Sequence, residues 1–270
     1  MCLKKLGWLY FAKYLIGNMS SYVSTYWKEE LVKRIRGKSL VLLLADSNLP
    51  ERYSMDIIEL CSGVTGTHLF KMQGGEQIKT HQHLIRVYNE LDRVGADRNS
   101  LLICLGGGTI SDLGGFAAST YKRGIDLVIL PTTVVGIVDA AIGGKNGINV
   151  SSEVGILKNQ IGTFYQPSLV GINLQWLDSL PNDEVKSGWG EMLKHALLEG
   201  GSHLDNFRTL EPNLTSLSPF LLHSARIKEG IVIRDEKEHG ERAILNLGHT
   251  IGHAIESLDI DSSNGPVIKH

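Results

Sequence analysis

The order of apolar and polar positions predicts alternating strands and helices in the first half of the chain. Short apolar runs bounded by turn residues indicate buried strands at 39–45, 67–72, 100–105 and 126–130. Between these runs, the segments 52–60 and 77–94 carry apolar residues at helical spacing. Such alternation predicts a parallel sheet with helices on both of its faces.

The pattern changes after residue 173. Strand-like runs disappear, and long amphipathic segments follow at 184–198, 217–238 and 242–258. We therefore predict two domains. An α/β domain with a Rossmann-like parallel sheet spans residues 1–175, and a mainly α-helical domain spans residues 176–270.

Composition and charge limit the kinds of molecule that the protein is expected to bind. The chain has 270 residues, with 42% hydrophobic and 21% charged, as in ordinary globular proteins. Its net charge of −2 argues against a nucleic-acid partner, but an anionic small substrate is compatible if basic residues gather in one place. No run approaches the roughly 20 apolar residues of a membrane span. The three cysteines, Cys2, Cys61 and Cys104, lie far apart, so we expect a reducing, cytoplasmic location.

Two segments that follow predicted strands are candidate ligand sites. Glycines 106–108 precede a helical stretch that includes Asp112, and glycines in such a turn let a pyrophosphate approach the helix N-terminus. The spacing is GGGxxxD rather than GxGxxG, so a tight turn without a ligand is the alternative. Thr132 and Thr133 follow the next strand and indicate either a ligand contact or a capped helix start.

A glycine pair at 143–144 is predicted to place Lys145 on an exposed, tightly turned loop. A lysine there would offer a cation to a phosphate or carboxylate, and Lys158 would add a second cation. The alternative is a plain surface loop.

The predicted helices of the second half carry polar residues at helical spacing. Glu191 and Lys194 share a face, which by itself predicts only an ion pair. Four further polar residues recur every three or four positions, as one helical stripe: Arg242, Asn246, His249 and His253. This stripe faces either solvent or a site, and two histidines four positions apart have metal-ligand spacing.

Five sequence blocks occur in one order: GGGTISDLGGFAASTYKRGI, LPTTVVGIVDAAIGGKNGIN, LKNQIGTFYQP, LPNDEVKSGWGEMLKHALL and DEKEHGERAILNLGHTIGHAIE. Together they resemble the 3-dehydroquinate synthase family of sugar-phosphate cyclases. The resemblance implies the corresponding two-domain fold and a carbon–oxygen lyase of the shikimate pathway of aromatic amino acid biosynthesis. Such an enzyme converts 3-deoxy-D-arabino-heptulosonate 7-phosphate to 3-dehydroquinate and phosphate by transient oxidation with NAD, phosphate elimination, re-reduction and intramolecular aldol closure.

The resemblance also implies the site residues. NAD would be bound by Asp46, Asn48, Glu76, Lys79, Gly106, Gly107, Gly108, Asp112, Thr132, Thr133, Lys145, Lys158, Trp176, Leu177, Asp178 and Ser179. Zn²⁺ or Co²⁺ would be held by Glu191, His249 and His270. The anionic sugar-acid phosphate would be contacted by Arg123, Asp139, Lys145, Lys158, Asn159, Lys194, Lys228, Arg242, Asn246 and His253. In this assignment only His249 of the histidine pair is a ligand, and His253 acts near the leaving phosphate. A homodimer is implied as well.

Three alternatives stay open. Another cyclase, of the inosose or valiolone synthase type, would use a sugar phosphate without a carboxylate, although Lys228, Arg242 and Asn246 match the dehydroquinate pattern. A metal-dependent alcohol dehydrogenase of the glycerol dehydrogenase type would release NADH. The resemblance also implies that relatives continue for about 80–100 residues beyond the end of this sequence, the size of a small domain. A truncated chain that binds NAD without turnover is therefore the third alternative.

Overall fold

The computed structural model describes residues 22–64, 66–152 and 155–248. Its centre is a six-stranded, wholly parallel sheet with strand order β1-β8-β5-β4-β2-β3. The strands are β1 (Val23–Ser24), β2 (Val41–Asp46), β3 (Thr67–Met72), β4 (Leu101–Gly106), β5 (Asp126–Pro131) and β8 (Leu169–Gly171). The four strands predicted from the apolar runs are β2 to β5, and they occupy the middle of the sheet and one of its edges.

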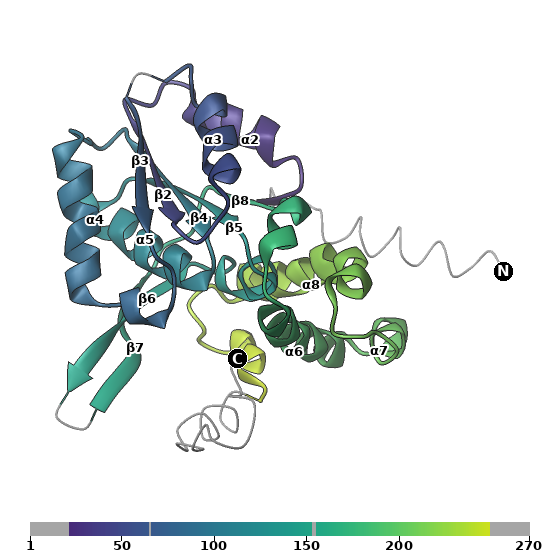
Figure 1. Cartoon of the computed structure of the whole chain (residues 1–270). Coiled ribbons are helices and arrows are strands. Elements are labelled where there is room, and N and C mark those ends of the chain that lie inside the picture. Colours follow the sequence, from purple (N-terminus) through teal and green to yellow (C-terminus); the bar gives the residue numbers. More distant parts are fainter. Residues whose placement is uncertain (1–21, 65, 153–154, 249–270) are drawn as a thin grey trace, which may run out of the picture.

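Helices cover both faces of this sheet (Figure 1). One face carries α2 (Trp27–Ile35) and α3 (Glu51–Leu60), and the other carries α4 (His81–Arg93) and α5 (Gly108–Thr120). Along β2, the side chains at 41, 43 and 45 join the core beneath α2 and α3, whereas those at 42 and 44 join the core beneath α4 and α5. This alternation follows from the two-residue period of a strand. The predicted Rossmann-like α/β class is confirmed.

The strand order reverses at β2. The chain runs from β2 to β3 on one side, and then returns to place β4 on the other side. In open parallel sheets, such a reversal leaves a crevice at the carboxyl ends of the two strands, and ligands bind there. Asp46 ends β2 and Gly106 ends β4, so these two predicted cofactor residues lie at this crevice.

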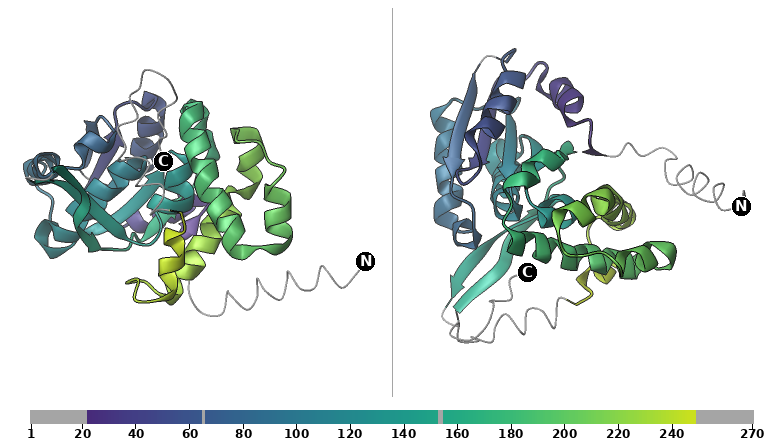
Figure 2. Two further views of the ribbon diagram at one scale, coloured as in Figure 1. Left: turned by 90° about the horizontal axis from the view of Figure 1, so that it is seen from below. Right: turned by 45° about the vertical axis from the view of Figure 1, so that its right-hand side comes forward.

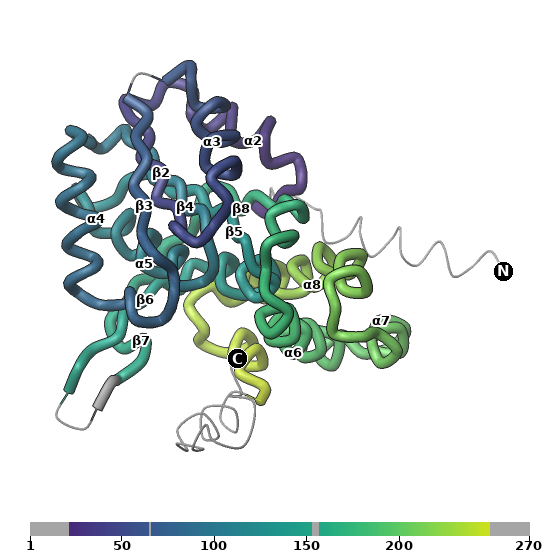
Figure 3. The backbone as a smooth tube through the Cα atoms, viewed as in Figure 1, coloured from purple at the N-terminus to yellow at the C-terminus, as the bar shows by residue number. Residues whose placement is uncertain are grey.

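The glycine pair before Lys145 leads into a hairpin rather than a loop, which corrects the sequence prediction. After the π-helical turn η3 (Gly136–Ala140), strands β6 (Lys145–Ser152) and β7 (Gly155–Phe164) pair in antiparallel fashion. The hairpin projects away from the six-stranded sheet (Figures 1 and 3). Most of its outer residues are exposed, so it lacks the apolar run by which buried strands are predicted.

The remaining chain forms helices beside the sheet (Figure 2). After the 3₁₀ helix η4 (Leu174–Ser179) come α6 (Asn182–Glu199), α7 (Gly201–Phe207) and α8 (Leu214–Arg234). Helix α8 also holds the first strand, because Glu229 accepts hydrogen bonds from the backbone N–H groups of Tyr22 and Val23 at 3.2 and 3.3 Å. In the part of the chain that the structure describes, no helix has the length and apolar character needed to cross a bilayer.

The long helix predicted over 242–258 is absent from the described part of that segment. The chain forms instead the short 3₁₀ helix η5 (Glu241–Asn246), in which Arg242 is buried and Asn246 is exposed. The two residues therefore do not share one helical stripe. The cause is Asp235, whose carboxylate accepts hydrogen bonds from the backbone N–H groups of His239, Gly240 and Arg242 and so fixes a turn after α8.

Two glycines of α6 give a matched test of its close packing. A Cβ added at Gly188 would lie 2.2 Å from Val134 Cγ1, in the segment after β5, whereas a Cβ at Gly190 would meet nothing within 4 Å. We expect Gly188→Ala to lower the free energy of unfolding by about 1–3 kcal/mol through overpacking. Gly190→Ala should raise it by about 0.5–1 kcal/mol, because alanine favours the helix. Urea unfolding of both variants measures this, and equal effects at the two positions would contradict the packing described.

Candidate active site

A cavity of about 510 Å³ lies where η3, α5, α8 and the β6–β7 hairpin meet. Its walls bring together residues from distant parts of the chain: Asp112, Asp139, Ala140, Ile142, Lys145, Asn146, Gly147, Asn159, Gly162, Thr163, Phe164 and Lys228. Four of the predicted substrate contacts line this cavity, namely Asp139, Lys145, Asn159 and Lys228.

The buried Lys228 and the partly buried Asp139 form an ion pair at the wall of the cavity. Lys228 Nζ donates to Asp139 Oδ1 at 2.6 Å and to the main-chain oxygen of Asp139 at 2.7 Å. Burial by itself would raise the pKa of Asp139, but the charges of Lys228 and Lys194 outweigh burial and hold that pKa well below its usual range. Burial also lowers the pKa of Lys228. Asp139 is therefore a permanent anion that fixes the Lys228 ammonium.

Lys145 begins β6 and is held by a carboxylate that the sequence did not single out. It forms an ion pair with Glu238, which also accepts a hydrogen bond from Asn246 Nδ2 at 2.8 Å. Burial would raise the pKa of Glu238, yet its bonds to Lys145 and Asn246 lower it overall. The sequence offered one indication of this role, because Glu238 lies in the same sequence block as the predicted site residue Asn246.

Arg242 is almost fully buried behind this wall, with 2% of its surface exposed. Its Nη2 donates to the oxygen of Gly143 at 2.9 Å, and its Nη1 donates to the oxygen of Glu236. Gly143 and Gly144 both have left-handed backbone, with φ of +104° and +63°, and a Cβ at Gly143 would lie 2.3 Å from Arg242 Nη2. Arg242 thus holds the turn that precedes Lys145, and its role as a substrate contact stays a prediction.

Glu191 lies in a cluster of possible metal ligands. One ligand atom each of Glu191, Asp139 and His195 lie within 4.8 Å of one another. Glu191 Oε2 is buried and is ion-paired with Lys194, but it has no aligned hydrogen bond within the described structure. Burial lowers the pKa of His195 to about 3, so its ring is neutral, and its buried Nε2 has no hydrogen-bond partner among the described residues. A carboxylate oxygen and a neutral imidazole are donors that suit a divalent transition metal.

The other predicted ligands, His249 and His270, lie outside the described residues, as does the predicted catalytic residue His253. His195 was not among the predicted metal ligands. Its position four residues after Glu191 on one helix is metal-ligand spacing, and this signal was readable in the sequence.

Several of the predicted cofactor residues lie at the crevice between β2 and β4. At the end of β2, Asp46 Oδ1 accepts hydrogen bonds from the backbone N–H groups of Asn48 and Gly74 at 2.9 and 3.0 Å. The glycine turn after β4 lies against the segment that contains Thr132 and Thr133, because a Cβ at Gly107 would lie 3.0 Å from Thr133 Cγ2. The turn therefore packs closely against the segment that follows β5.

Lys79 joins the crevice to the hairpin. Its Nζ donates to Asp112 Oδ2 at 2.7 Å and to Asn159 Oδ1. Nearby, Glu76 Oε1 accepts a hydrogen bond from Asn149 Nδ2 at 2.7 Å. The predicted cofactor residues Glu76 and Lys79 therefore contact β6 and β7, and Lys79 links the hairpin to Asp112 on α5.

Several predicted site residues lie away from the cavity. Arg123 is exposed in the 3₁₀ turn that follows α5, at the opposite end of that 13-residue helix from the glycine turn, about 20 Å away. Lys158 is exposed on β7. The side chains of Trp176 and Leu177 are buried, and the Trp176 ring lies 4.8 Å from that of Trp27. In the same segment, Asp178 and Ser179 are exposed.

The titration of Asp112 predicts a pH dependence of stability. Burial raises the pKa of Asp112 from 3.8 to about 6, although the charge of Lys79 opposes the shift. The folded chain therefore keeps a proton that the unfolded chain has already released. The contribution of Asp112 to the free energy of unfolding should therefore fall as the pH rises from about 4 to about 6, because the folded state keeps the Asp112 proton over that interval, whereas the lowered pKa of His195 acts in the opposite direction.

Asp112→Asn cannot titrate and should remove this part of the pH dependence. Urea unfolding across the same interval measures it. The control variant Asp56→Asn changes an exposed aspartate of α3 and should keep the slope of the unaltered chain. An unchanged slope in Asp112→Asn would contradict the assignment.

Two protein-family models and a known enzyme are similar in sequence to this chain. The family model described as 3-dehydroquinate synthase N-terminal matches residues 69–187, and the one described as 3-dehydroquinate synthase C-terminal matches residues 188–263. The 3-dehydroquinate synthase of Leptospira interrogans is 40% identical over 234 residues, which cover 85% of this chain and 63% of that enzyme. The chain thus spans less than two thirds of the length of this relative.

Solved structures share the fold. The crystal structure of 2-deoxy-scyllo-inosose synthase complexed with carbaglucose-6-phosphate, NAD⁺ and Co²⁺ matches with a TM-score of 0.76 and 26% identity, over 87% of this chain and 66% of that one. A 2-epi-5-epi-valiolone synthase from Streptomyces hygroscopicus, with NAD⁺ and Zn²⁺ bound, matches with a TM-score of 0.71 and 23% identity, over 91% and 70% of the two chains. Because the two family matches join at residues 187 and 188 and together run through 69–263, the chain belongs to the 3-dehydroquinate synthase family.

Proposed function

We propose that this protein is a 3-dehydroquinate synthase, a carbon–oxygen lyase that forms 3-dehydroquinate and phosphate from 3-deoxy-D-arabino-heptulosonate 7-phosphate. The observation that carries the proposal is the cavity in which the cations of Lys145 and Lys228 converge beside Asp139, in a chain 40% identical to an enzyme of that name. Two ammonium groups in one cavity suit a substrate that carries both a phosphate and a carboxylate.

The proposed cofactors are NAD and a divalent metal, Zn²⁺ or Co²⁺. NAD would lie at the carboxyl ends of β2, β4 and β5, against Asp46, the glycine turn and the threonine pair, and Glu191 would be a metal ligand. Two solved neighbours contain NAD⁺ together with Co²⁺ or Zn²⁺, which supports this choice. When bound, the nicotinamide accepts and returns a hydride, and the metal polarises the hydroxyl that is oxidised.

The side chains of the cavity would bind and orient the substrate. Lys228, fixed by Asp139, offers its remaining ammonium hydrogen to an anionic group. Lys145 is 46% exposed at its side chain, so it can leave Glu238 for a phosphate or carboxylate oxygen. Phe164 and Ile142 form apolar parts of the wall and reduce the access of water to the charged groups.

Phosphate release by the full chain tests the proposal, with the seven-carbon keto-acid phosphate, NAD and Zn²⁺ supplied. We expect release that needs both NAD and the metal, with no NADH accumulating. Stoichiometric NADH would indicate an alcohol dehydrogenase instead. Turnover of sedoheptulose 7-phosphate or glucose 6-phosphate, in place of the carboxylated substrate, would indicate another cyclase. NAD binding without phosphate release from any substrate would indicate a non-catalytic chain.

Two properties of the whole protein belong to the same proposal. A homodimer follows from the family resemblance, and sedimentation equilibrium of the full chain tests it. A reducing, cytoplasmic location is supported by Cys61 and Cys104, which are both buried free thiols.

A further inference from the structure

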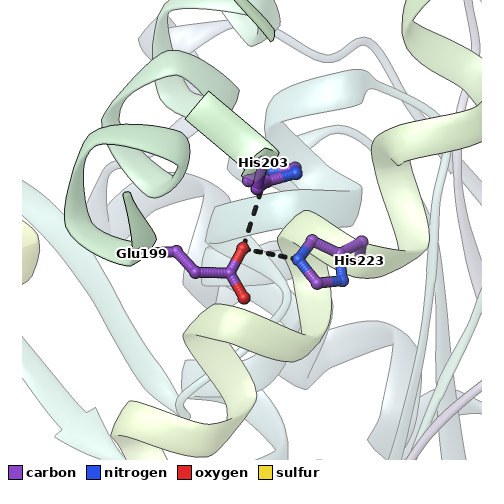
Figure 4. Close-up of side chains that lie close together, drawn as sticks. All are labelled: Glu199, His203 and His223. Atoms are coloured by element: carbon purple, nitrogen blue, oxygen red, sulfur yellow. Dashed lines mark hydrogen bonds and ion pairs between the residues drawn. The ribbon is translucent and has the colours of Figure 1, made fainter. Parts of the chain in front are cut away.

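A second cluster of metal-binding side chains lies outside the cavity, where three helices meet (Figure 4). Glu199 ends α6, His203 lies in α7, and His223 lies in α8. Glu199 Oε2 is 2.6 Å from His223 Nε2 and 4.0 Å from His203 Nε2, and one ligand atom of each residue lies within 4.8 Å of the other two. The three side chains therefore point toward one common position.

His203 supplies an independent indication of a ligand. The residue is 7% exposed, and its Nε2 is buried without a hydrogen-bond partner among the described residues. Its ring packs beside Phe207 and Phe220, with centroid separations of 6.3 and 6.0 Å. The ring nitrogen of a neutral imidazole is a common ligand of divalent transition metals. An unpaired buried nitrogen is unfavourable, and a metal ion at the common position would satisfy it.

The spacing fits a tetrahedral ion after small movements. Ligand atoms held about 2.0–2.1 Å from zinc lie about 3.4 Å from one another. The two separations between Glu199 and the histidines, 2.6 and 4.0 Å, lie on either side of that value. Shifts of less than about 1 Å would bring both separations to the distance expected between two ligands of one zinc ion. The side chains of Glu199 and His223 are 32% and 31% exposed, which leaves a path for the ion to enter and room for a water ligand.

We propose that Glu199, His203 and His223 bind a divalent transition metal of the Zn²⁺ class. The site is separate from Glu191, which lies eight residues earlier on α6, or about 12 Å along the helix axis. It is also independent of the proposed catalytic function. A bound ion would join the end of α6 to α7 and α8 and so stiffen the helix that carries Glu191 and Lys194.

Zinc content tests the proposal directly. The full chain is stripped with a chelator and dialysed against Zn²⁺, and bound zinc is counted by elemental analysis. Glu199→Gln and His223→Asn should each bind one zinc ion per chain fewer than the unaltered protein. The control His81→Asn removes an exposed histidine of α4 and should bind the full number. Equal zinc content in all four proteins would overturn the proposal. Metal bound at Glu191 does not affect this comparison, because Glu191 is unchanged in all four proteins.

Amide exchange in the unaltered chain gives a second readout, and Glu199→Gln serves as its comparison. A ligand that binds only the closed state lowers the population of the open state by a factor of one plus the ratio of its concentration to its Kd. Zn²⁺ at ten times the Kd of this site should therefore slow amide exchange in α7 about tenfold. The same addition to Glu199→Gln should leave α7 unchanged. Exchange in α7 that does not respond to Zn²⁺ in the unaltered chain would also overturn the site.

Discussion

Lys228→Met should lower the free energy of unfolding by about 1.5–3 kcal/mol, because it removes the ammonium that hydrogen-bonds the partly buried carboxylate of Asp139, while the charge of Lys194 remains nearby. Methionine keeps most of the volume of the lysine side chain, so lost packing contributes little. Phosphate release should fall at least about a hundredfold, since the proposed anion contact is removed together with the charge. Urea unfolding measures the first effect and the phosphate assay measures the second.

An exposed ion pair provides the control for Lys228→Met. Lys186 lies 3.2 Å from Asp183 on the surface of α6, and Lys186→Met should change the free energy of unfolding by no more than about 0.5 kcal/mol. The double variant Asp139→Asn/Lys228→Met should be less destabilised than the sum of its single changes, because it leaves no buried charge unpaired. A Lys228→Met protein as stable as the control would mean that the pair contributes nothing to the fold.

Lys145→Met should lower phosphate release by about 10²–10³-fold while leaving the fold intact. Removing one preorganised donor from a developing or bound anion has effects of this size. Its pairing with Glu238 is half exposed, so its loss should change stability by less than about 1 kcal/mol. Steady-state phosphate release and urea unfolding measure the two quantities on the same preparation.

Lys237→Met is the matched control for Lys145→Met, because Lys237 is exposed and lies next to Glu238 in the chain. It should keep full activity. If Lys145→Met released phosphate at the rate of this control, Lys145 would not contact the substrate. If it unfolded instead, the hairpin would depend on the Lys145–Glu238 pair for its stability.

Strands β2, β4 and β5 could be predicted because nearly all of their residues are buried. Continuous apolar runs such as 41–45 indicate such strands, and the glycine turn after β4 lies where the sequence placed it. The β6–β7 hairpin could not be found in this way. Its strands are stabilised by pairing with each other while many of their side chains face solvent, so the apolar pattern is weak there.

The segment after α8 was misread for a different reason. Its apolar and polar residues have helical spacing, but the carboxylate of Asp235 binds three backbone N–H groups and closes a turn. That competition between a side chain and a helix depends on local geometry that periodicity does not report. The consequence is that Arg242 points into the interior, whereas Asn246 lies at the surface and reaches Glu238.

The sequence by itself determined the residue types of the candidate site, the family and the alternation of strands with helices. It also placed the glycine turn at the carboxyl end of a strand, because strand and turn are local features. Only the tertiary structure decided which charges meet. Asp139 and Lys228 are 89 positions apart, and Lys145 and Glu238 are 93 apart. Such pairs exist only because α8 and the turn after it pack against η3 and the hairpin, and this packing depends on the whole fold rather than on any segment.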